Sequence, residues 1–286
     1  MNNQKIVNWD EWKLRCHAIG YVMGQPKLKK DKEAGNLSAT AKSYLLKVWI
    51  EEKFNRKKDI KSKYITKGLG VEQANITLYS RVKKVFYKKN TDRLENEFIS
   101  GEPDLFEGEE IKKAVTIIDM KSSWDVYTFY DVVMDMIEAA EKVKESDEGI
   151  NIPNGMNPDY YWQGQGYLDL SGAARFLLAY GLIDTPQALI DKEKSNLLFE
   201  LGGYLGITGD SEKEANYLAA CEEFDRSLTF EDIPMGQRLI ELSAERNEAH
   251  IELIHQRVIK CREYLKYLDA TLTPAILASY AAKIAA

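Results

Sequence analysis

The chain has 286 residues, of which 44% are hydrophobic and 29% charged, as in an ordinary globular protein that forms one large domain or two smaller ones. No run approaches the roughly 18 consecutive apolar residues of a membrane span, and the N-terminal segment MNNQKIVNWDEWK lacks the apolar stretch of a secretory signal. We therefore expect a cytoplasmic protein that does not bind a membrane.

The three cysteines, Cys16, Cys221 and Cys261, are odd in number and far apart. This pattern indicates reduced thiols. It also excludes a zinc ribbon and an iron–sulfur cluster held by four thiolates.

The net charge of −6 is unevenly distributed. Residues 1–100 contain 22 Lys and Arg against 11 Asp and Glu, whereas the remainder contains 17 against 34. Basic clusters occur at 27–32, 56–63 and 81–89. They are either solvated helix faces or surfaces for a polyanion such as nucleic acid.

At the N-terminus, residues 5–23 predict one helix and a turn, followed by a mobile basic loop over 24–37. Ser38 or Thr40 is suited to cap the helix that comes next.

The middle of the chain predicts a helix from Gly68 to Lys84 and then two strands, over 85–89 and 96–100. The apolar run Val115 to Ile118 predicts a third strand, which ends in Asp119, Met120 and Lys121. We expect a three-stranded sheet with the preceding helix packed on it.

An aromatic cluster follows, with Trp124, Tyr127 and Phe129. It either fills the core or forms a surface on which unpaired bases stack.

Beyond this cluster, the pattern predicts a helix over 132–144, a loop over 145–158 and a helix capped by Asp159. A strand is expected over 175–182, and residues from 186 onward read as helical. The longest of these predicted helical stretches, 236–268, carries His250 and His255, whose spacing of five suits surface residues better than metal ligands.

The strand that ends in Asp119 carries the strongest chemical signal. Side chains alternate along a strand, so Asp119 and Lys121 project on one side. Three other acidic-x-Lys triplets, at 51–53, 59–61 and 110–112, lie in charge-rich surroundings and are read as surface. Only the Asp119 copy follows an apolar run and has Pro103-Asp104 upstream.

Three carboxylates, those of Glu72, Asp104 and Asp119, supply the hard oxygen ligands that Mg²⁺ or Mn²⁺ prefers. Two such ions stabilise both the attacking and the leaving oxygen of a phosphodiester. Lys121 would orient or deprotonate the attacking water. Gln163, supported by Tyr167, could bind the nucleophile, Lys121 or a phosphate.

Four segments, in this order, are similar to the GxxxE, GxxD, DxK and QxxxY motifs of the RecB-like branch of PD-(D/E)xK nucleases. They are GLGVE (68–72), GEPD (101–104), DMK (119–121) and QGQGY (163–167). Within that branch the chain resembles the YqaJ-type, lambda-exonuclease-like viral recombinases over about residues 10–185.

The resemblance implies an α+β fold, an αβββαβ core with helical additions at both ends. It divides the chain into a nuclease core with an N-terminal helical and basic region (1–185) and a mainly helical extension (186–286). The activity implied is Mg²⁺- or Mn²⁺-dependent degradation of double-stranded DNA ends, with two ions and no iron–sulfur cluster.

Residue roles also follow from the resemblance. Glu72, Asp104 and Asp119 would hold metal, Lys121 would be the catalytic lysine and Gln163 its accessory. The candidate DNA- and phosphate-binding residues are Arg15, Tyr167, Ser122 and Ser123. Arg15 begins a segment similar to Arg-x-Ser in relatives, but His17 stands where serine is usual.

Family members typically work beside a single-strand annealing protein in phage-type recombination, and a ring-shaped homotrimer is known among them. Two alternatives remain beside the exonuclease. One is a structure-selective endonuclease on the same core, and the other is a catalytically silent scaffold that binds DNA ends.

Overall fold

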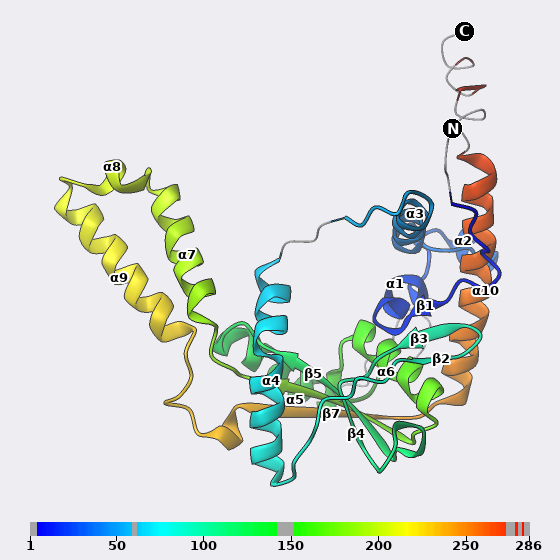
Figure 1. Ribbon diagram of the computed structural model, residues 1–286, viewed down its shortest axis with the longest axis horizontal. Coiled ribbons are helices and arrows are strands. Elements are labelled where there is room, and N and C mark those ends of the chain that lie inside the picture. The colour runs from blue at the N-terminus through cyan, green and yellow to red at the C-terminus, as the bar shows by residue number, and fades with distance from the viewer. Residues whose placement is uncertain (1–4, 59–61, 142–151, 273–277, 280–281, 283–286) are drawn as a thin grey trace.

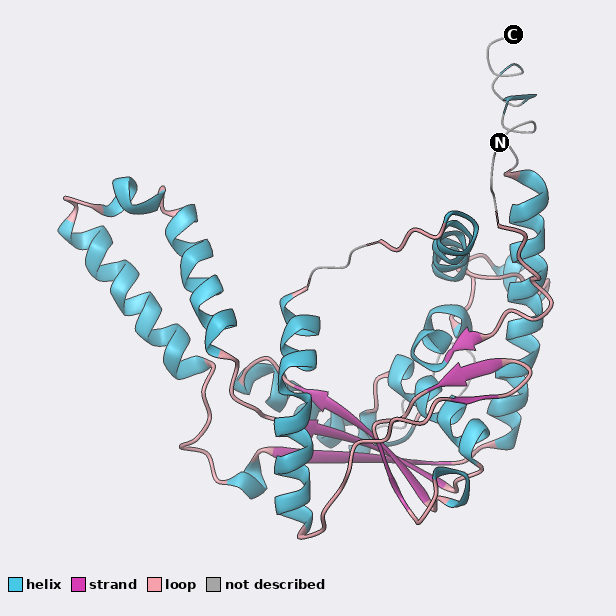
Figure 2. Ribbon diagram, in the orientation of Figure 1, coloured by secondary structure: helices cyan, strands magenta, loops and turns pink. Residues whose placement is uncertain are grey.

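The computed structural model describes residues 5–58, 62–141, 152–272, 278–279 and 282. Its centre is a four-stranded mixed sheet in the order β4-β5-β6-β7. Strand β5 (Thr116–Ser122) pairs antiparallel with β4 (Leu105–Glu107) and parallel with β6 (Arg175–Gly181), and β7 (Leu239–Glu245) pairs antiparallel with β6. The strands and helices are mapped in Figure 2.

A second, small sheet has the order β1-β3-β2 and is formed by two- and three-residue strands. The strands are β1 (Leu14–Arg15), β2 (Leu94–Glu95) and β3 (Ile99–Gly101). It brings Arg15 beside Ser100, just before the GEPD segment.

Helices cover both faces of the four-stranded sheet (Figure 1). On one face, Ile76 and Tyr79 of α4 (Lys63–Lys83) pack against Ile118 and Met120. On the other face, α6 (Pro158–Ser171) joins a larger core that continues to the remaining N- and C-terminal helices. Those helices are α1 (Ile19–Met23), α3 (Ala39–Phe54) and α10 (Glu248–Thr271).

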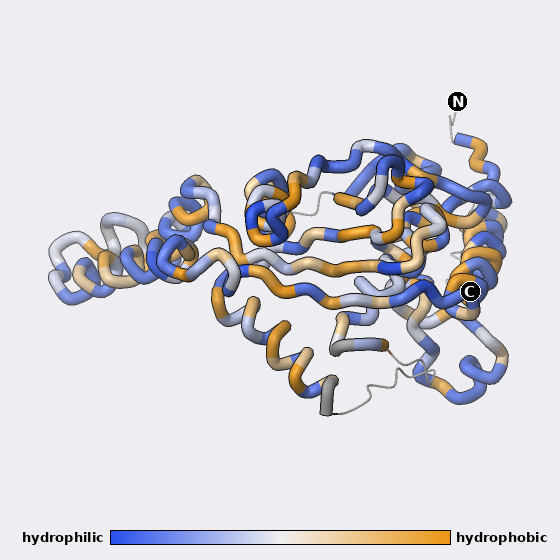
Figure 3. Tube along the Cα trace, turned by 90° about the horizontal axis from the view of Figure 1, so that it is seen from below, coloured by the Kyte–Doolittle hydropathy of each residue, from blue (hydrophilic) through white to orange (hydrophobic). Residues whose placement is uncertain are grey.

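The remaining helices are α2 (Lys29–Glu33), α5 (Val126–Glu141), α7 (Gln187–Glu200), α8 (Gly203–Ile207) and α9 (Ser211–Ser227). Short 3₁₀ turns lie at Cys16–Ala18, Ile111–Lys113, Pro153–Gly155 and Met235–Gln237. Helices α7, α8 and α9 form an arm that projects from the body (Figures 1 and 3). Among the described residues, no helix combines the length and apolar character needed to cross a bilayer.

Helix ends follow local chemistry. The Ser38 hydroxyl accepts from the backbone N–H of Ala41 at 3.1 Å and caps α3, as the sequence predicts. Helix α6 is capped by the Asn157 side chain, not by Asp159, and it ends at Gly172 with φ of 78°.

Hydropathy follows the layering. Figure 3 shows apolar residues along the central strands and alternating polar and apolar residues through the arm. The mixed α+β class with helical additions is confirmed, and the strand predicted over 175–182 is present as β6.

Several element predictions are wrong. Residues 85–89 form a loop, because Tyr87 packs on Tyr79 and no strand among the described residues pairs with this backbone. Residues 239–245, expected within a helix, form β7. The N-terminal segment 5–23 contains a strand as well as helix, and 24–37 contains the short helix α2. The sheet has four strands, not three. Part of the loop predicted over 145–158, up to residue 151, lies outside the described residues.

Candidate active site

The side chains of Asp119 and Lys121 share the α6 face of β5, as alternation predicts. Asp119 is 3% exposed. Its Oδ1 accepts from Gln163 Nε2 at 3.2 Å, and its Oδ2 forms an ion pair with Lys121 Nζ at 2.6 Å. The ion pair is not aligned as a hydrogen bond, so Oδ2 is a buried oxygen with no hydrogen-bond donor among the described residues.

Lys121 is held as a charged ammonium. Burial tends to lower the pKa of this amine, but the adjacent Asp119 carboxylate outweighs burial, and the net pKa lies above its usual value. The Tyr160 ring, 4.8 Å from Nζ, offers a further favourable contact for the positive charge.

Asp104 lies beside β5 because its loop is fixed by Asn90. The Asn90 N–H donates to the Asp104 carbonyl at 2.7 Å, and Asn90 Nδ2 donates to the Pro103 carbonyl at 2.9 Å. The carboxylate Oδ2 of Asp104 in turn accepts from the Met120 N–H at 2.7 Å.

The pKa of Asp104 is raised to about 7. Burial is the main cause and the nearby Asp119 carboxylate is the second, opposed by the Met120 N–H. The two carboxyl groups therefore repel each other in a site that favours an added cation.

Glu72 approaches from α4, and its carboxylate forms an ion pair with Lys89 Nζ at 2.7 Å. Gly68, one helical turn earlier, has no other atom within 4 Å of where a β-carbon would stand. The surface of α4 at Gly68 is therefore open.

The residues at the end of β5 fit a divalent cation in part. Two carboxylates lie there: the pKa of Asp104 is raised, and the buried Oδ2 of Asp119 is ion-paired with Lys121 but has no aligned hydrogen-bond donor among the described residues. Within the described chain, no three His, Cys, Asp or Glu side chains already converge as metal ligands. Glu72, tied to Lys89, is the carboxylate that would have to turn toward the other two.

Gln163 and Tyr167 support the site from α6. Gln163 Nε2 also lies 2.8 Å from the Tyr167 hydroxyl, which faces the Glu102 carbonyl at 3.4 Å. Both side chains are 5% exposed. They are placed to orient Asp119, while Tyr167 is too buried to form an open phosphate contact.

The other candidate phosphate contacts differ in position. Arg15 is exposed on β1. The His17 pKa is lowered by burial, and the positive charges of Arg15, Lys121 and Arg93 lower it further. Arg93 was missed by sequence reasoning, because an arginine before a short strand carries no distinguishing signal.

The two serines after Lys121 differ in their contacts. The Ser122 hydroxyl accepts from Asn75 Nδ2 at 3.1 Å, and Ser123 is buried, with its N–H donating to the Gly181 carbonyl. Ser122 therefore joins the end of β5 to Asn75 of α4, and Ser123 continues the backbone pairing of β5 with β6.

The aromatic cluster after β5 divides in two. Trp124 and Phe129 are buried, and the buried amine of Lys67 donates to the Trp124 carbonyl at 2.8 Å. Tyr127 is 79% exposed. Core filling therefore describes Trp124 and Phe129 and not Tyr127.

The two histidines of α10 were expected to be surface residues, but both contact the core. His250 Nδ1 lies 2.6 Å from the Tyr161 hydroxyl, and His255 Nε2 lies 2.7 Å from Asp169 Oδ2 and stacks on Phe98. Both attach α10 to the core, and neither belongs to the candidate site.

No protein-family model and no curated protein matches this chain. Among solved structures, it is similar to a phage-related exonuclease from Haemophilus somnus 129PT, with 29% identity, a TM-score of 0.66, and coverage of 92% of this chain and 97% of the other. It also resembles LHK-Exo, an alkaline exonuclease from Laribacter hongkongensis, with 13% identity, a TM-score of 0.51, and coverage of 96% and 98%.

The complex of LHK-Exo with dAMP gives the same identity and TM-score, with coverage of 95% of this chain and 94% of the other. These likenesses each extend over more than nine-tenths of this chain. The chain therefore has the fold of these exonucleases, consistent with the PD-(D/E)xK superfamily.

Proposed function

We propose that this protein is a metal-dependent DNA exonuclease that degrades double-stranded ends. The observation that carries the proposal is the cluster of Asp104, Asp119 and Lys121 at the end of β5, where a half-buried and a buried carboxylate lie beside an ammonium. Likeness to a phage-related exonuclease at 29% identity over 92% of the chain supports the same reading.

Asp104 and Asp119 would hold a divalent cation, with Glu72 as a third ligand after release from Lys89. Such a cation, Mg²⁺ or Mn²⁺, would neutralise phosphate charge and lower the pKa of a bound water. The carboxylates need this partner, because unpaired negative charges facing DNA would weaken binding.

Lys121 would act on water and phosphate as a hydrogen-bond donor. Its raised pKa means that the amine keeps its proton near neutral pH, so it is better suited to orienting the attacking water and offsetting transition-state charge than to removing a proton. Gln163 would keep Asp119 in position.

The direct test is digestion of linear duplex DNA labelled at one end, with Mg²⁺ and with EDTA, alongside a covalently closed circle. We expect metal-dependent loss of the linear substrate with the circle intact, and the order of label release gives the polarity. Equal attack on the circle would indicate an endonuclease. If no divalent metal supported cleavage, the remaining hypothesis would be a catalytically silent scaffold that binds DNA ends.

The biological setting we propose is phage-type recombination in the host cytoplasm, beside a single-strand annealing protein. Assignment to the YqaJ-type branch, a homotrimeric ring and phosphate binding by Arg15 belong to the same proposal. Arg15→Gln is expected to weaken binding of 5′-phosphorylated ends more than binding of 5′-hydroxyl ends.

A further inference from the structure

The loop after α4 presents one of the most exposed aromatic side chains of the described chain. Phe86 is 89% exposed and its neighbour Val85 is 52% exposed. Helix α4 ends at Lys83, and the φ of 56° at the next residue, Lys84, turns the chain out of the helix. The loop thus begins with two apolar side chains in solvent.

Local contacts fix this arrangement. The Tyr87 N–H donates to the Ser80 hydroxyl at 3.2 Å, and the Tyr87 ring packs edge-on against Tyr79 with centroids 5.0 Å apart. The Tyr87 hydroxyl lies 3.1 Å from Glu107 Oε1. Because Tyr87 is anchored inward, the adjacent Phe86 is held outward.

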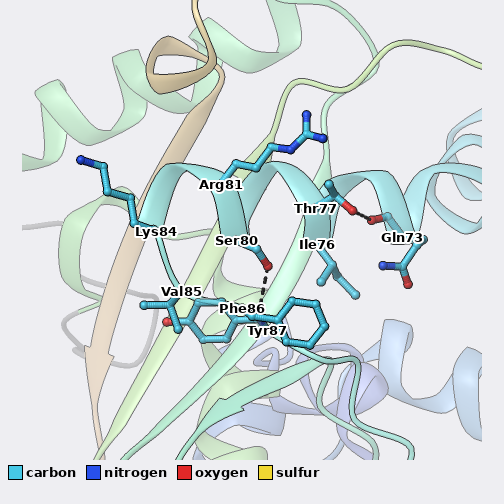
Figure 4. Close-up of a pocket in the computed structure, with 9 residues that line it drawn as sticks. All are labelled: Gln73, Ile76, Thr77, Ser80, Arg81, Lys84, Val85, Phe86 and Tyr87. Atoms are coloured by element: carbon cyan, nitrogen blue, oxygen red, sulfur yellow. Dashed lines mark hydrogen bonds between the residues drawn. The ribbon is translucent and has the colours of Figure 1, made fainter.

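Phe86 lies between two hollows. One, of about 350 Å³, is bordered by the last turns of α4, and the close-up in Figure 4 shows Arg81 and Lys84 extending from that helix above Val85 and Phe86. The other, of about 490 Å³, lies toward Phe106 and Gly108 on the far side of the loop. The aromatic ring therefore has space beside it for flat groups.

The surroundings of Phe86 are positively charged. The side chains of Arg81, Lys84 and Lys88 are exposed, and none of them has a carboxylate partner among the described residues. Glu107, a carboxylate that lines the second hollow, accepts a hydrogen bond from the Tyr87 hydroxyl. A polyanion fits this surface by charge.

The loop is joined to the candidate active site. Lys89 pairs with Glu72, and the next residue, Asn90, fixes the backbone of Asp104. Lys89 follows Phe86 by three positions, so their α-carbons lie at most about 11 Å apart. A strand that leaves the site needs only a few nucleotides to reach Phe86.

We propose that Phe86, Arg81, Lys84 and Lys88 form an accessory site for single-stranded DNA. An unpaired base stacks on the Phe86 ring, and the three cations contact the flanking phosphates. The ligand is single-stranded because bases in a duplex are already stacked and cannot reach an exposed ring. This inference rests on the proposed DNA exonuclease function and assigns it the path of the unpaired strand.

The test is fluorescence anisotropy with a labelled oligothymidylate of about 16 nucleotides, in EDTA so that no cleavage occurs. Phe86→Ala is expected to weaken binding about 5- to 50-fold, and Phe86→Trp is expected to retain it. The matched control is Phe199→Ala, which removes an equally exposed phenylalanine (83%) from the arm and is expected to change nothing. Charge removal at Arg81, Lys84 and Lys88 should reduce the salt slope by about 2.

The outcomes separate this site from the proposed activity. If the enzyme digests DNA and Phe86→Ala binds oligothymidylate normally, the accessory site is wrong. If Phe86→Ala loses binding while the natural chain cleaves nothing, the accessory site stands and the exonuclease proposal fails. If Phe86→Ala weakened binding of blunt duplex DNA as much as binding of oligothymidylate, the assignment to the single strand would be wrong. It would also be wrong if Phe86→Ala abolished binding of a protein partner and left DNA binding intact.

Discussion

Gln163 connects helix α6 to strand β5 in the candidate site through one amide nitrogen. That nitrogen contacts both the Asp119 carboxylate and the Tyr167 hydroxyl, and all three groups are buried. A buried carboxylate that loses an amide donor can rotate, and catalysis is sensitive to small misplacements of such groups.

We therefore expect Gln163→Leu to lower kcat by about 10- to 100-fold, as is usual when a group that orients a metal ligand is removed. Tyr167→Phe, which keeps the ring and removes the hydroxyl, should have a smaller effect. Steady-state digestion at several Mg²⁺ concentrations would measure both. Unchanged kcat and unchanged Mg²⁺ dependence in Gln163→Leu would contradict the positioning role.

Asp104 gives a prediction on stability in the absence of metal. Its folded-state pKa of about 7 lies above the usual value of 3.8, so its contribution to stability is present below about pH 4 and is lost as pH rises through 7. Asp104→Asn should therefore stabilise the metal-free protein at pH 8 by roughly 1–2 kcal/mol, while abolishing cleavage.

Thermal unfolding in EDTA at pH 5 and pH 8 would check this expectation. The gain in Tm from the substitution should be larger at pH 8 than at pH 5, because the repulsion between Asp104 and Asp119 needs both charges. An equal gain in Tm at the two pH values would show that the folded protein does not disfavour the charged form of Asp104.

Strand alternation was sufficient to predict that Asp119 and Lys121 share a side. It could not predict Lys89, Asn90 or Arg93, because these residues reach the site from loops and short strands whose course depends on tertiary contacts. A lysine or asparagine in a polar loop looks the same whether or not it contacts a buried carboxylate.

Among the elements, helix α6 is the one whose sequence is most constrained by packing. A β-carbon at Gly164 would lie 2.3 Å from the Phe176 ring of β6, and one at Gly166 would lie 2.4 Å from Ile19 Cδ1. The glycines allow the helix that carries Gln163 to lie close against the sheet.

Gly164→Ala is expected to destabilise the fold by about 1–3 kcal/mol, because the ring of a core phenylalanine must shift. The control is Gly68→Ala in α4, where no atom lies within 4 Å and the higher helix propensity of alanine should add about 0.5–1 kcal/mol. Chemical denaturation would compare the two. Equal effects of the two substitutions would contradict the packing argument.

Burial between layers also explains which elements could be predicted from the sequence. β5 and β6 are apolar runs between two helical layers, and their pattern predicts strands without further information. β7 has the sequence Leu239–Glu245, in which polar residues alternate on an edge, and it directly precedes a long amphipathic helix. Its pairing with β6 across a long separation decides its structure.

Over the whole molecule, stability is unevenly distributed. The arm of α7, α8 and α9 projects from the sheet, and its described side chains are mostly exposed, apart from Ile190 at the base and Ile207 near the tip. The Lys194–Asp225 ion pair at 2.6 Å links α7 to α9. Such a pair contributes little where it faces water.

Backbone amide hydrogen exchange should therefore be faster in α8 and α9 than in β5 and β6. The difference in rate should reflect the difference between the free energies of local and global unfolding. Mass spectrometry of peptides from both regions would measure it at one pH. Protection of α9 equal to that of β5 would mean that the arm is covered in solution.

Charge is also segregated, and it predicts how DNA binding responds to salt. The arm has nine Asp and Glu against four Lys and Arg, whereas residues 1–100 have 22 basic against 11 acidic residues. DNA affinity should fall steeply with salt, because each neutralised duplex phosphate contributes about 0.9 to the slope of log K against log salt.

Changing Arg56, Lys57 and Lys58 to Gln should lower that slope by about 2 to 3. The matched variant changes Lys192, Lys213 and Arg226 of the acidic arm, with the same loss of charge. If both variants changed the slope equally, net charge rather than the basic N-terminal surface would govern binding.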